Sequence, residues 1–311
     1  MSHFDQLSQP GCGLFITDGG LETEIIFHEG IDLPNFASFV LLNSEEGMAA
    51  LGRYYRRYLD IAKKSGYGFI LETPTWRANL GWAEAMGVNQ DELIDINRRG
   101  FEFIEGLRGE YADCDIPIIV SGNIGPAGDG YTVDGVLSAD EACALHALQV
   151  DTFATCGADV VTAITMTYPD EAIGIVKAAK AAGIPAVIGF TTETDGRLPD
   201  GQTLKSAIWQ VDEATDGGPA YYMVNCAHTE HYSGVLADGE AWTKRIRGVR
   251  SNASRLSHAE LDECEELDAG DPREFGQLNR ELLDRFPEMM VFGGCCGTDH
   301  RHIEETVRCL G

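Results

Sequence analysis

Three cysteines stand where thiolate chemistry is possible. Cys295 and Cys296 are adjacent within the glycine-rich run 293–298, and Cys226 directly follows Asn225 well upstream. A disulfide between neighbours is disfavoured, because Cα atoms across a trans peptide lie about 3.8 Å apart and disulfides usually need at least about 4.4 Å. Two buried, inert thiols are the alternative. The flanking glycines favour a site instead, because they let the backbone bend so that both sulfurs face inward.

Three thiolates are a ligand set that suits Zn²⁺. With Cys226, Cys295 and Cys296 as ligands, a fourth position open to substrate would be the catalytic arrangement. The alternative is a structural zinc, or none, in a protein that binds or senses thiols. The lack of a visible fourth protein ligand argues against a closed structural site. His228 and His231 follow Cys226 closely, and either is a candidate fourth ligand in a resting state, although a solvated loop is the commoner setting.

The elements that must position these cysteines are eight β-rich runs alternating with longer helical stretches. Several runs are almost continuously apolar, as in parallel strands covered on both faces. The predicted strands are Leu14–Thr17, Gly68–Glu72, Ile116–Ser121, Val160–Thr165, Ala186–Thr191, Tyr221–Asn225, Arg247–Ser251 and Met289–Gly293.

Eight β/α units in about 300 residues match a single (β/α)8 barrel of the α/β class, which places its active site at the C-terminal ends of the strands. We expect one domain over residues 1–311. A doubly wound sheet is the alternative, but neither GxGxxG nor GxxxxGK occurs.

Three helix boundaries can be predicted from capping residues. Asn43 with Glu46, and Ser138 with Glu141, have the spacing of capping boxes. An alanine-rich helix over 170–182 should end at Gly183, a residue suited to the C-terminal cap.

The charge excludes several classes of partner. Of 311 residues, 50 are acidic and 23 basic, giving a formal charge of -27. Nucleic acid and anionic membranes both require a basic surface.

The apolar runs are far shorter than the ~20 residues of a membrane helix, and the polar segment 1–10 does not resemble a signal peptide. Nine scattered cysteines fit a reducing compartment. We expect a cytoplasmic protein that acts on small molecules, with its oligomeric state open.

The motifs together resemble the zinc-dependent homocysteine S-methyltransferase family, which includes betaine–homocysteine and S-methylmethionine–homocysteine methyltransferases. The strongest likeness is the ordered pair of Asn225-Cys226 and the Gly-Gly-Cys-Cys-Gly-Thr run 293–298. Weaker likenesses lie in 18–24, 122–126 and 195–201, so the resemblance covers nearly the whole chain.

The resemblance implies zinc-dependent transfer of a methyl group to the thiolate of homocysteine, giving methionine. S-Methylmethionine and S-adenosylmethionine are the favoured donors. It implies that Cys226, Cys295 and Cys296 hold the zinc, that Asp18 contacts the acceptor's amino group, and that Asn225 orients the loop or the ligand. No general acid or base is implied, because the reacting thiolate is activated by the metal. The same chemistry on another thiol or selenol is the alternative.

The sequence departs from the family around the acceptor. Ile164 stands where many members carry a glutamate that binds the ammonium group. Either the acceptor lacks that group or another carboxylate, such as Glu72, replaces the glutamate. Trp76 either faces a cationic donor through its ring or belongs to the core. Arg77 should pair with a substrate carboxylate or with Glu72. Arg250, on the seventh predicted strand, has no counterpart that we can name.

Overall fold

The computed structural model describes residue 4 and residues 13–311, apart from 134, 237–239 and 265. We expected that segment 1–10 is not a signal peptide. Most of this segment lies outside the described part of the chain. Eight parallel strands close into a barrel in sequence order, and β8 pairs with β1 to complete the ring. The predicted (β/α)8 barrel is thus confirmed. The strands are β1 (Phe15–Ile16), β2 (Gly68–Glu72), β3 (Ile118–Ile124), β4 (Val160–Met166), β5 (Ala186–Phe190), β6 (Tyr221–Asn225), β7 (Ile246–Ser251) and β8 (Val291–Gly294).

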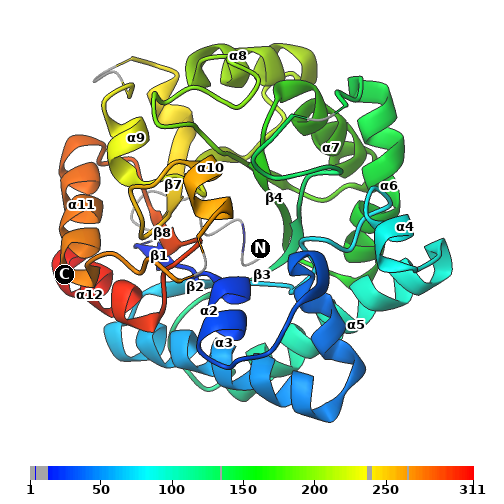
Figure 1. Ribbon diagram of the computed structural model, residues 1–311, viewed down its shortest axis with the longest axis horizontal. Helices are drawn as coiled ribbons and strands as arrows, with labels where there is room; N and C mark the ends of the chain where they lie inside the picture. Colours follow the sequence, from blue (N-terminus) through cyan, green and yellow to red (C-terminus); the bar gives the residue numbers. More distant parts are fainter. Residues whose placement is uncertain (1–3, 5–12, 134, 237–239, 265) are drawn as a thin grey trace.

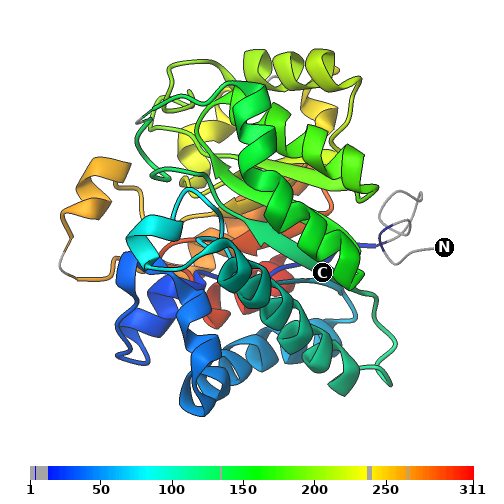
Figure 2. The ribbon, with the colours of Figure 1, turned by 90° about the vertical axis from the view of Figure 1, so that its right-hand side faces the viewer.

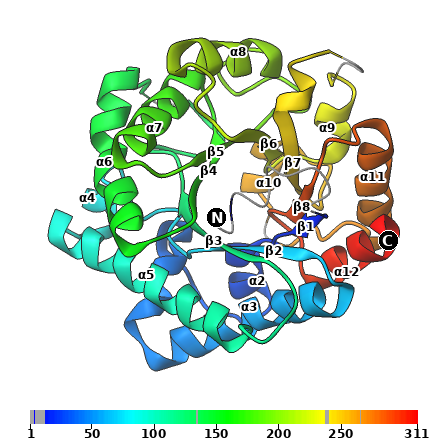
Figure 3. The same ribbon diagram turned by 180° about the vertical axis from the view of Figure 1, so that it is seen from behind.

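Helices surround the barrel as an outer ring, which Figure 1 and Figure 3 show from its two ends. The α-helices are α2 (Leu21–Phe27), α3 (Glu45–Ser65), α4 (Ala83–Met86), α5 (Gln90–Glu110), α6 (Ala139–Cys156), α7 (Pro169–Ala182), α8 (Leu204–Thr215), α9 (Thr229–Ser233), α10 (His258–Asp262), α11 (Pro272–Arg285) and α12 (His300–Leu310). The 3-10 helices are η1 (Pro34–Phe36), η2 (Ser38–Asn43) and η3 (Thr243–Arg245).

The predicted caps are confirmed at two helices and wrong at one. Ser138 and Glu141 form the capping box of α6, and α7 ends at Gly183 with a φ of 72°. The box expected at Asn43 and Glu46 does not form. Ser44 is the N-cap of α3 instead, because residues 38–43 continue as the 3-10 helix η2 and the backbone first becomes extended at Ser44.

Two apolar layers hold the barrel. Side chains such as Phe15, Ile119 and Val187 fill its interior, and all three are fully buried. A larger cluster packs between the strands and the outer helices. The short helices α2, α4 and α10 gather at one end of the barrel, seen at the left of Figure 2. Since α2 directly follows β1, this is the end where the strands finish.

Among the described residues, none of the helices combines the length and apolar composition that crossing a membrane would require.

Candidate active site

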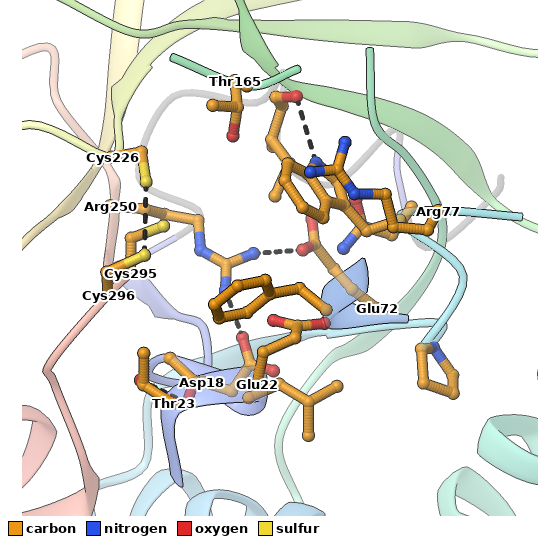
Figure 4. Close-up of a pocket in the computed structure, with 18 of the residues that line it drawn as sticks. Asp18, Glu22, Thr23, Glu72, Arg77, Thr165, Cys226, Arg250, Cys295 and Cys296 are labelled. Carbon is orange, nitrogen blue, oxygen red and sulfur yellow. Dashed lines mark hydrogen bonds and ion pairs between the residues drawn. The ribbon is translucent and has the colours of Figure 1, made fainter. Parts of the chain in front are cut away.

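The three cysteines predicted to act together meet at this end of the barrel. Cys226 follows the last residue of β6, and Cys295-Cys296 follow the last residue of β8. Their three sulfur atoms all lie within 4.8 Å of one another, and the Sγ atoms of Cys226 and Cys296 are 3.5 Å apart (Figure 4). Strands 70 residues apart in sequence thus deliver one sulfur cluster.

Glycines let the loops after β1 and β8 pack closely enough to form this cluster. A Cβ added to Gly20 would lie 2.6 Å from the carbonyl oxygen of Cys295. A Cβ on Gly294 would lie 2.0 Å from the Oγ1 of Thr298. Real Cβ atoms do not approach so closely, so a larger residue at Gly20 would push the cysteine loop away from the end of β1, and one at Gly294 would displace Thr298.

The backbone of Cys226 is held in an unusual conformation. Its φ is 54°, in the left-handed region that non-glycine residues rarely occupy. The backbone N–H of Cys226 donates to the carbonyl of Arg250 at 3.0 Å. The carbonyl of Cys226 accepts from the Nε2 of His258 at 2.8 Å. Strain of this kind persists where surrounding contacts impose it, and it is common at functional sites.

Tyr131 covers the sulfur cluster. Its hydroxyl lies 3.4 Å from the Sγ of Cys226 and 3.3 Å from the Sγ of Cys296. Its ring stacks on the ring of His258, with centroids 4.1 Å apart. Sequence reasoning missed both residues, because Tyr131 lies in a loop without hydrophobic periodicity and His258 lies far from the cysteines in sequence.

The sulfur cluster fits a tetrahedral metal. Hydrogen bonds from Cys226 and Cys295 hold the pKa of the Cys296 thiol well below its usual range, while contacts with Cys295 and Cys296, together with burial, raise the pKa of Cys226. A divalent cation would replace the shared protons. Zn–S bonds of about 2.3 Å in a tetrahedron place sulfurs about 3.8 Å apart, which is close to the Cys226–Cys296 separation of 3.5 Å. No histidine joins the three cysteines as a potential metal ligand among the described residues.

Arg250 fills the space between the two carboxylates that were expected to receive substrate. Its Nη2 donates to Asp18 at 2.5 Å, its Nη1 donates to Glu72, and its Nε donates to the carbonyl of Gly294 at 3.1 Å (Figure 4). All three charged side chains are almost fully buried. A positively charged residue near the C-terminal end of a barrel strand was the sequence feature that could have indicated this network.

Burial and pairing act in opposite directions on these charges. Burial raises the pKa of Glu72 to about 7, and the Arg250 guanidinium opposes that rise. Burial likewise raises the pKa of Asp18. Burial also opposes the charge on Arg250, but Glu72 and Asp18 outweigh it and raise the pKa of the guanidinium. Arg250 therefore remains a cation held by two carboxyl groups.

Asn225 binds a neighbouring strand. Its Oδ1 accepts from the N–H of Thr165 at 2.8 Å, and its Nδ2 donates to the Oγ1 of the same residue at 2.9 Å. Thr165 has a φ of 64°, which is strained for a β-branched residue. Asn225 itself is fully buried. It fixes the end of β4 next to Ile164, which lines the pocket.

Trp76 and Arg77 both line the pocket, and Figure 4 shows Arg77 on the side opposite the cysteines. The Arg77 guanidinium lies 4.0 Å from the ring centroid of Trp76 and 3.8 Å from that of Trp82. The indole nitrogen of Trp76 is 3.5 Å from the carbonyl oxygen of Ile164. Of the two partners considered for Arg77, Glu72 is bound by Arg250 instead.

Glu22 is a further carboxylate of the pocket that sequence reasoning missed. It lies in the first turn of α2, where acidic residues are common because they complement the helix dipole. Its Oε1 accepts from the Oγ of Ser38 at 2.8 Å. Burial raises its pKa to about 7 against the effect of that hydrogen bond. Its position four residues after Asp18 was the available indication.

Comparisons with known proteins agree with this architecture. The metallated form of the homocysteine methyltransferase MmuM from Escherichia coli matches with a TM-score of 0.73 and 18% identity over 98% of each chain. The oxidized form matches with a TM-score of 0.75 and 19% identity over 98% of this chain and 99% of the other. At these identities the likeness shows the fold.

The family is shown by sequence. The comparison with curated proteins gives no significant match. The model of the homocysteine S-methyltransferase family matches residues 15–310, nearly the whole chain. The chain therefore belongs to the homocysteine S-methyltransferase family and is a methyltransferase.

Proposed function

We propose that the protein transfers a methyl group from an activated donor to the thiolate of homocysteine, giving methionine, with Zn²⁺ held by Cys226, Cys295 and Cys296. The observation that carries the proposal is the cluster of three sulfurs within 4.8 Å at the end of the barrel where (β/α)8 enzymes work. Family membership supports the reaction class.

The metal's contribution would be to keep the acceptor sulfur deprotonated near neutral pH, since a coordinating thiol gives up its proton. The chain's own residues have a different task. They hold acceptor sulfur and donor methyl in line, and such positioning can contribute about 7–11 kcal/mol to lowering a barrier. Tyr131 and His258 would keep Cys226 and Cys296 in place. No step requires a general acid or base from the protein.

The favoured donors are the sulfonium compounds S-methylmethionine and S-adenosylmethionine. Aromatic side chains suit a sulfonium, because a ring face attracts a cation. Phe36, Trp76 and Tyr131 all line the pocket. Phe36 is half exposed, so its ring is not part of the core.

A second acceptor class follows from one observation. Ile164 lines the pocket, and Asp18 and Glu72 are both bound to Arg250. A thiol without an ammonium group would not need a free carboxylate at that place. Homocysteine remains the favoured acceptor, because the pocket offers another carboxylate.

The deciding experiment is zinc-edge X-ray absorption on the reduced, zinc-loaded protein, with and without L-homocysteine. We expect three sulfur ligands and one light atom, changing to four sulfurs when homocysteine is added. Three sulfurs that do not respond to homocysteine would favour the second acceptor class. A protein that binds no zinc would refute the proposed metal chemistry.

A further inference from the structure

Glu22 and Arg77 are charged side chains that line the pocket and make no ion pair within the described part of the chain. Glu22 accepts one hydrogen bond, from the hydroxyl of Ser38 at 2.8 Å. Arg77 donates its Nε to the carbonyl of Asn35 at 3.3 Å and its Nη1 to the carbonyl of Gly128 at 3.0 Å. A carboxylate and a guanidinium in the same pocket therefore each retain bonding capacity for a ligand.

Arg77 is the more deeply buried of the two, with 5% of its surface exposed. Indole rings of Trp76 and Trp82 lie within 4.0 Å of the guanidinium carbon. A guanidinium carries five N–H donors, and two of them have acceptors in the described residues. A buried cation without a counter-ion is costly, and a carboxylate matches the fork of the guanidinium. The side chain is thus suited to an anionic group of the ligand.

The other acidic residues of the pocket are already engaged. Arg250 binds both Asp18 and Glu72. The Oδ1 of Asp129 accepts from the backbone N–H groups of Tyr131 and Thr132, which fixes the loop that carries the tyrosine. Among the described lining carboxylates, Glu22 and Asp129 make no ion pair, and Glu22, with one hydrogen bond against two for Asp129, is the better placed to receive a cation.

Glu22 also has the right place between the sulfur cluster and Arg77. Glu22 lines the same pocket as Cys295 and Arg77. Burial lowers the pKa of Arg77 to about 10, and the negative charges of Asp129 and then of Glu22 oppose that fall. Figure 4 shows the cysteines and Arg77 on opposite sides of the pocket, with Glu22 between and below them.

A ligand whose sulfur lies on the cysteine cluster would therefore meet a carboxylate and then a guanidinium. In homocysteine, two methylene carbons separate the sulfur from the α-carbon, which carries both the ammonium group and the carboxylate. We infer that Glu22 binds the ammonium group and Arg77 the carboxylate of an α-amino acid thiol acceptor. This inference rests on the proposed function and explains how the pocket can accept homocysteine despite Ile164 and Arg250.

The test compares three thiols on the zinc-loaded protein: homocysteine, gamma-mercaptobutyrate, which lacks the ammonium group, and homocysteamine, which lacks the carboxylate. Binding is measured by titration calorimetry, and KM by methyl transfer. Glu22→Gln should weaken homocysteine about ten- to hundredfold, the range for a hydrogen bond to a charged group, and leave gamma-mercaptobutyrate unchanged. Arg77→Gln should weaken the binding of homocysteine and of gamma-mercaptobutyrate, which both carry a carboxylate, to a similar extent. The binding of homocysteamine should be unchanged.

Controls separate recognition from folding. Glu22→Asp and Arg77→Lys keep the charges, so they should keep the order of preference among the thiols even where affinity falls. Glu281→Gln, on the exposed face of α11, should change nothing.

Some outcomes would overturn the inference. Equal losses for all three thiols in Glu22→Gln would indicate a structural role for Glu22. A loss of ammonium preference in Asp18→Asn, with none in Glu22→Gln, would assign the ammonium group to Asp18. Wild-type protein that neither binds nor methylates homocysteine would refute the proposed function together with the inference.

Discussion

Arg250 donates to Asp18 at 2.5 Å across the end of the barrel, although β7, which carries Arg250, and β1, which Asp18 follows, are not neighbours. The same guanidinium also binds Glu72 on β2. One side chain thus links three strands on both sides of the barrel's closure. Of the carboxyl groups it holds, Asp18 is the one that the resemblance assigns to the acceptor, and Glu72 is the one that we expected to replace the family's glutamate.

Replacing Arg250 should destabilise the fold. Arg250→Met would leave two buried carboxyl groups without their cation, and breaking a buried pair in this way costs about 3–5 kcal/mol. Urea denaturation at pH 7 would measure the loss. Adding Asp18→Asn and Glu72→Gln should recover most of it. Arg98→Met is the matched control, because its ion pairs are exposed and such pairs contribute about 1 kcal/mol or less. If Arg250→Met were as stable as the wild type, the ion pairs of Arg250 with Asp18 and Glu72 would not stabilise the fold.

Each cysteine of the cluster should be required for metal binding. Serine at Cys226, Cys295 or Cys296 should lower zinc affinity by more than about a hundredfold, which is the upper range for losing an outer-shell partner. Methyl transfer should be lost with the metal. Zinc content after dialysis against a weak chelator measures the effect. Cys143→Ser, outside the cluster on α6, should retain both metal and activity. Full activity in any of the three cluster variants would rule out the proposed chemistry.

Tyr131→Phe tests the hydroxyl that contacts two sulfurs. The ring can keep its stacking on His258, so only the hydroxyl's contribution is removed. We expect zinc affinity to fall about ten- to hundredfold, measured by competition with a chromophoric chelator. Tyr111→Phe removes a hydroxyl that donates to Asp60 and serves as the control. Equal affinities in the two variants would show that the hydroxyl does not support the thiolates.

Glu22 should make the folded state less stable as pH rises. Its pKa is about 7 in the folded protein against an ordinary value of 4.5, so the folded state binds the proton more tightly between these pH values. The free energy of unfolding should fall by at most about 1.4 kcal/mol for each pH unit in that window. Burial is the main cause of the raised pKa of Glu22; the hydrogen bond from Ser38 opposes it, and Cys295 and Asp18 add to it.

In Glu22→Gln this contribution should disappear, so the unfolding free energy should decrease less between pH 5 and pH 7 than it does in the wild type. Chemical denaturation of reduced, chelator-treated protein across the pH range provides the measurement. Glu281→Gln should show the wild-type slope. A slope unaltered by Glu22→Gln would mean that Glu22 titrates in the folded protein as it does in the unfolded chain.

Asn225→Ala should weaken the end of β4. It leaves the buried N–H of Thr165 without its acceptor, a loss of about 1–3 kcal/mol. Asn225→Asp keeps the acceptor oxygen and should recover part of the stability. Thermal unfolding, monitored by circular dichroism, measures the stability of the alanine and aspartate variants. If alanine and aspartate behaved alike, the hydrogen bond to Thr165 would not be what matters.

The barrel could be predicted from the sequence because each parallel strand is buried on both faces and therefore leaves an apolar run. Strand ends then indicate which distant residues share a site, and so Cys226 could be placed with Cys295 and Cys296. The partners of Arg250 could not be predicted in this way. They are 178 and 232 residues away, and which carboxylate a guanidinium binds depends on side-chain geometry across several strands.

The same limit applies at shorter range. The N-cap of α3 is one residue later than predicted, because whether Asn43 or Ser44 becomes extended depends on how the preceding 3-10 helix packs. Glu22 looked like an ordinary acidic residue in a helix's first turn, and only the pocket around it shows its unpaired charge within the described residues.

The pairing of β8 with β1 also sets the order of events during protein synthesis. Two of the three thiols follow β8, so a nascent chain that has emerged only through β7 carries one thiol of the cluster. A metal held by all three thiols could then bind only after the last strand has left the ribosome and closed the ring. Products of termination before β8 would retain most of the barrel sequence and yet lack two of the three thiols.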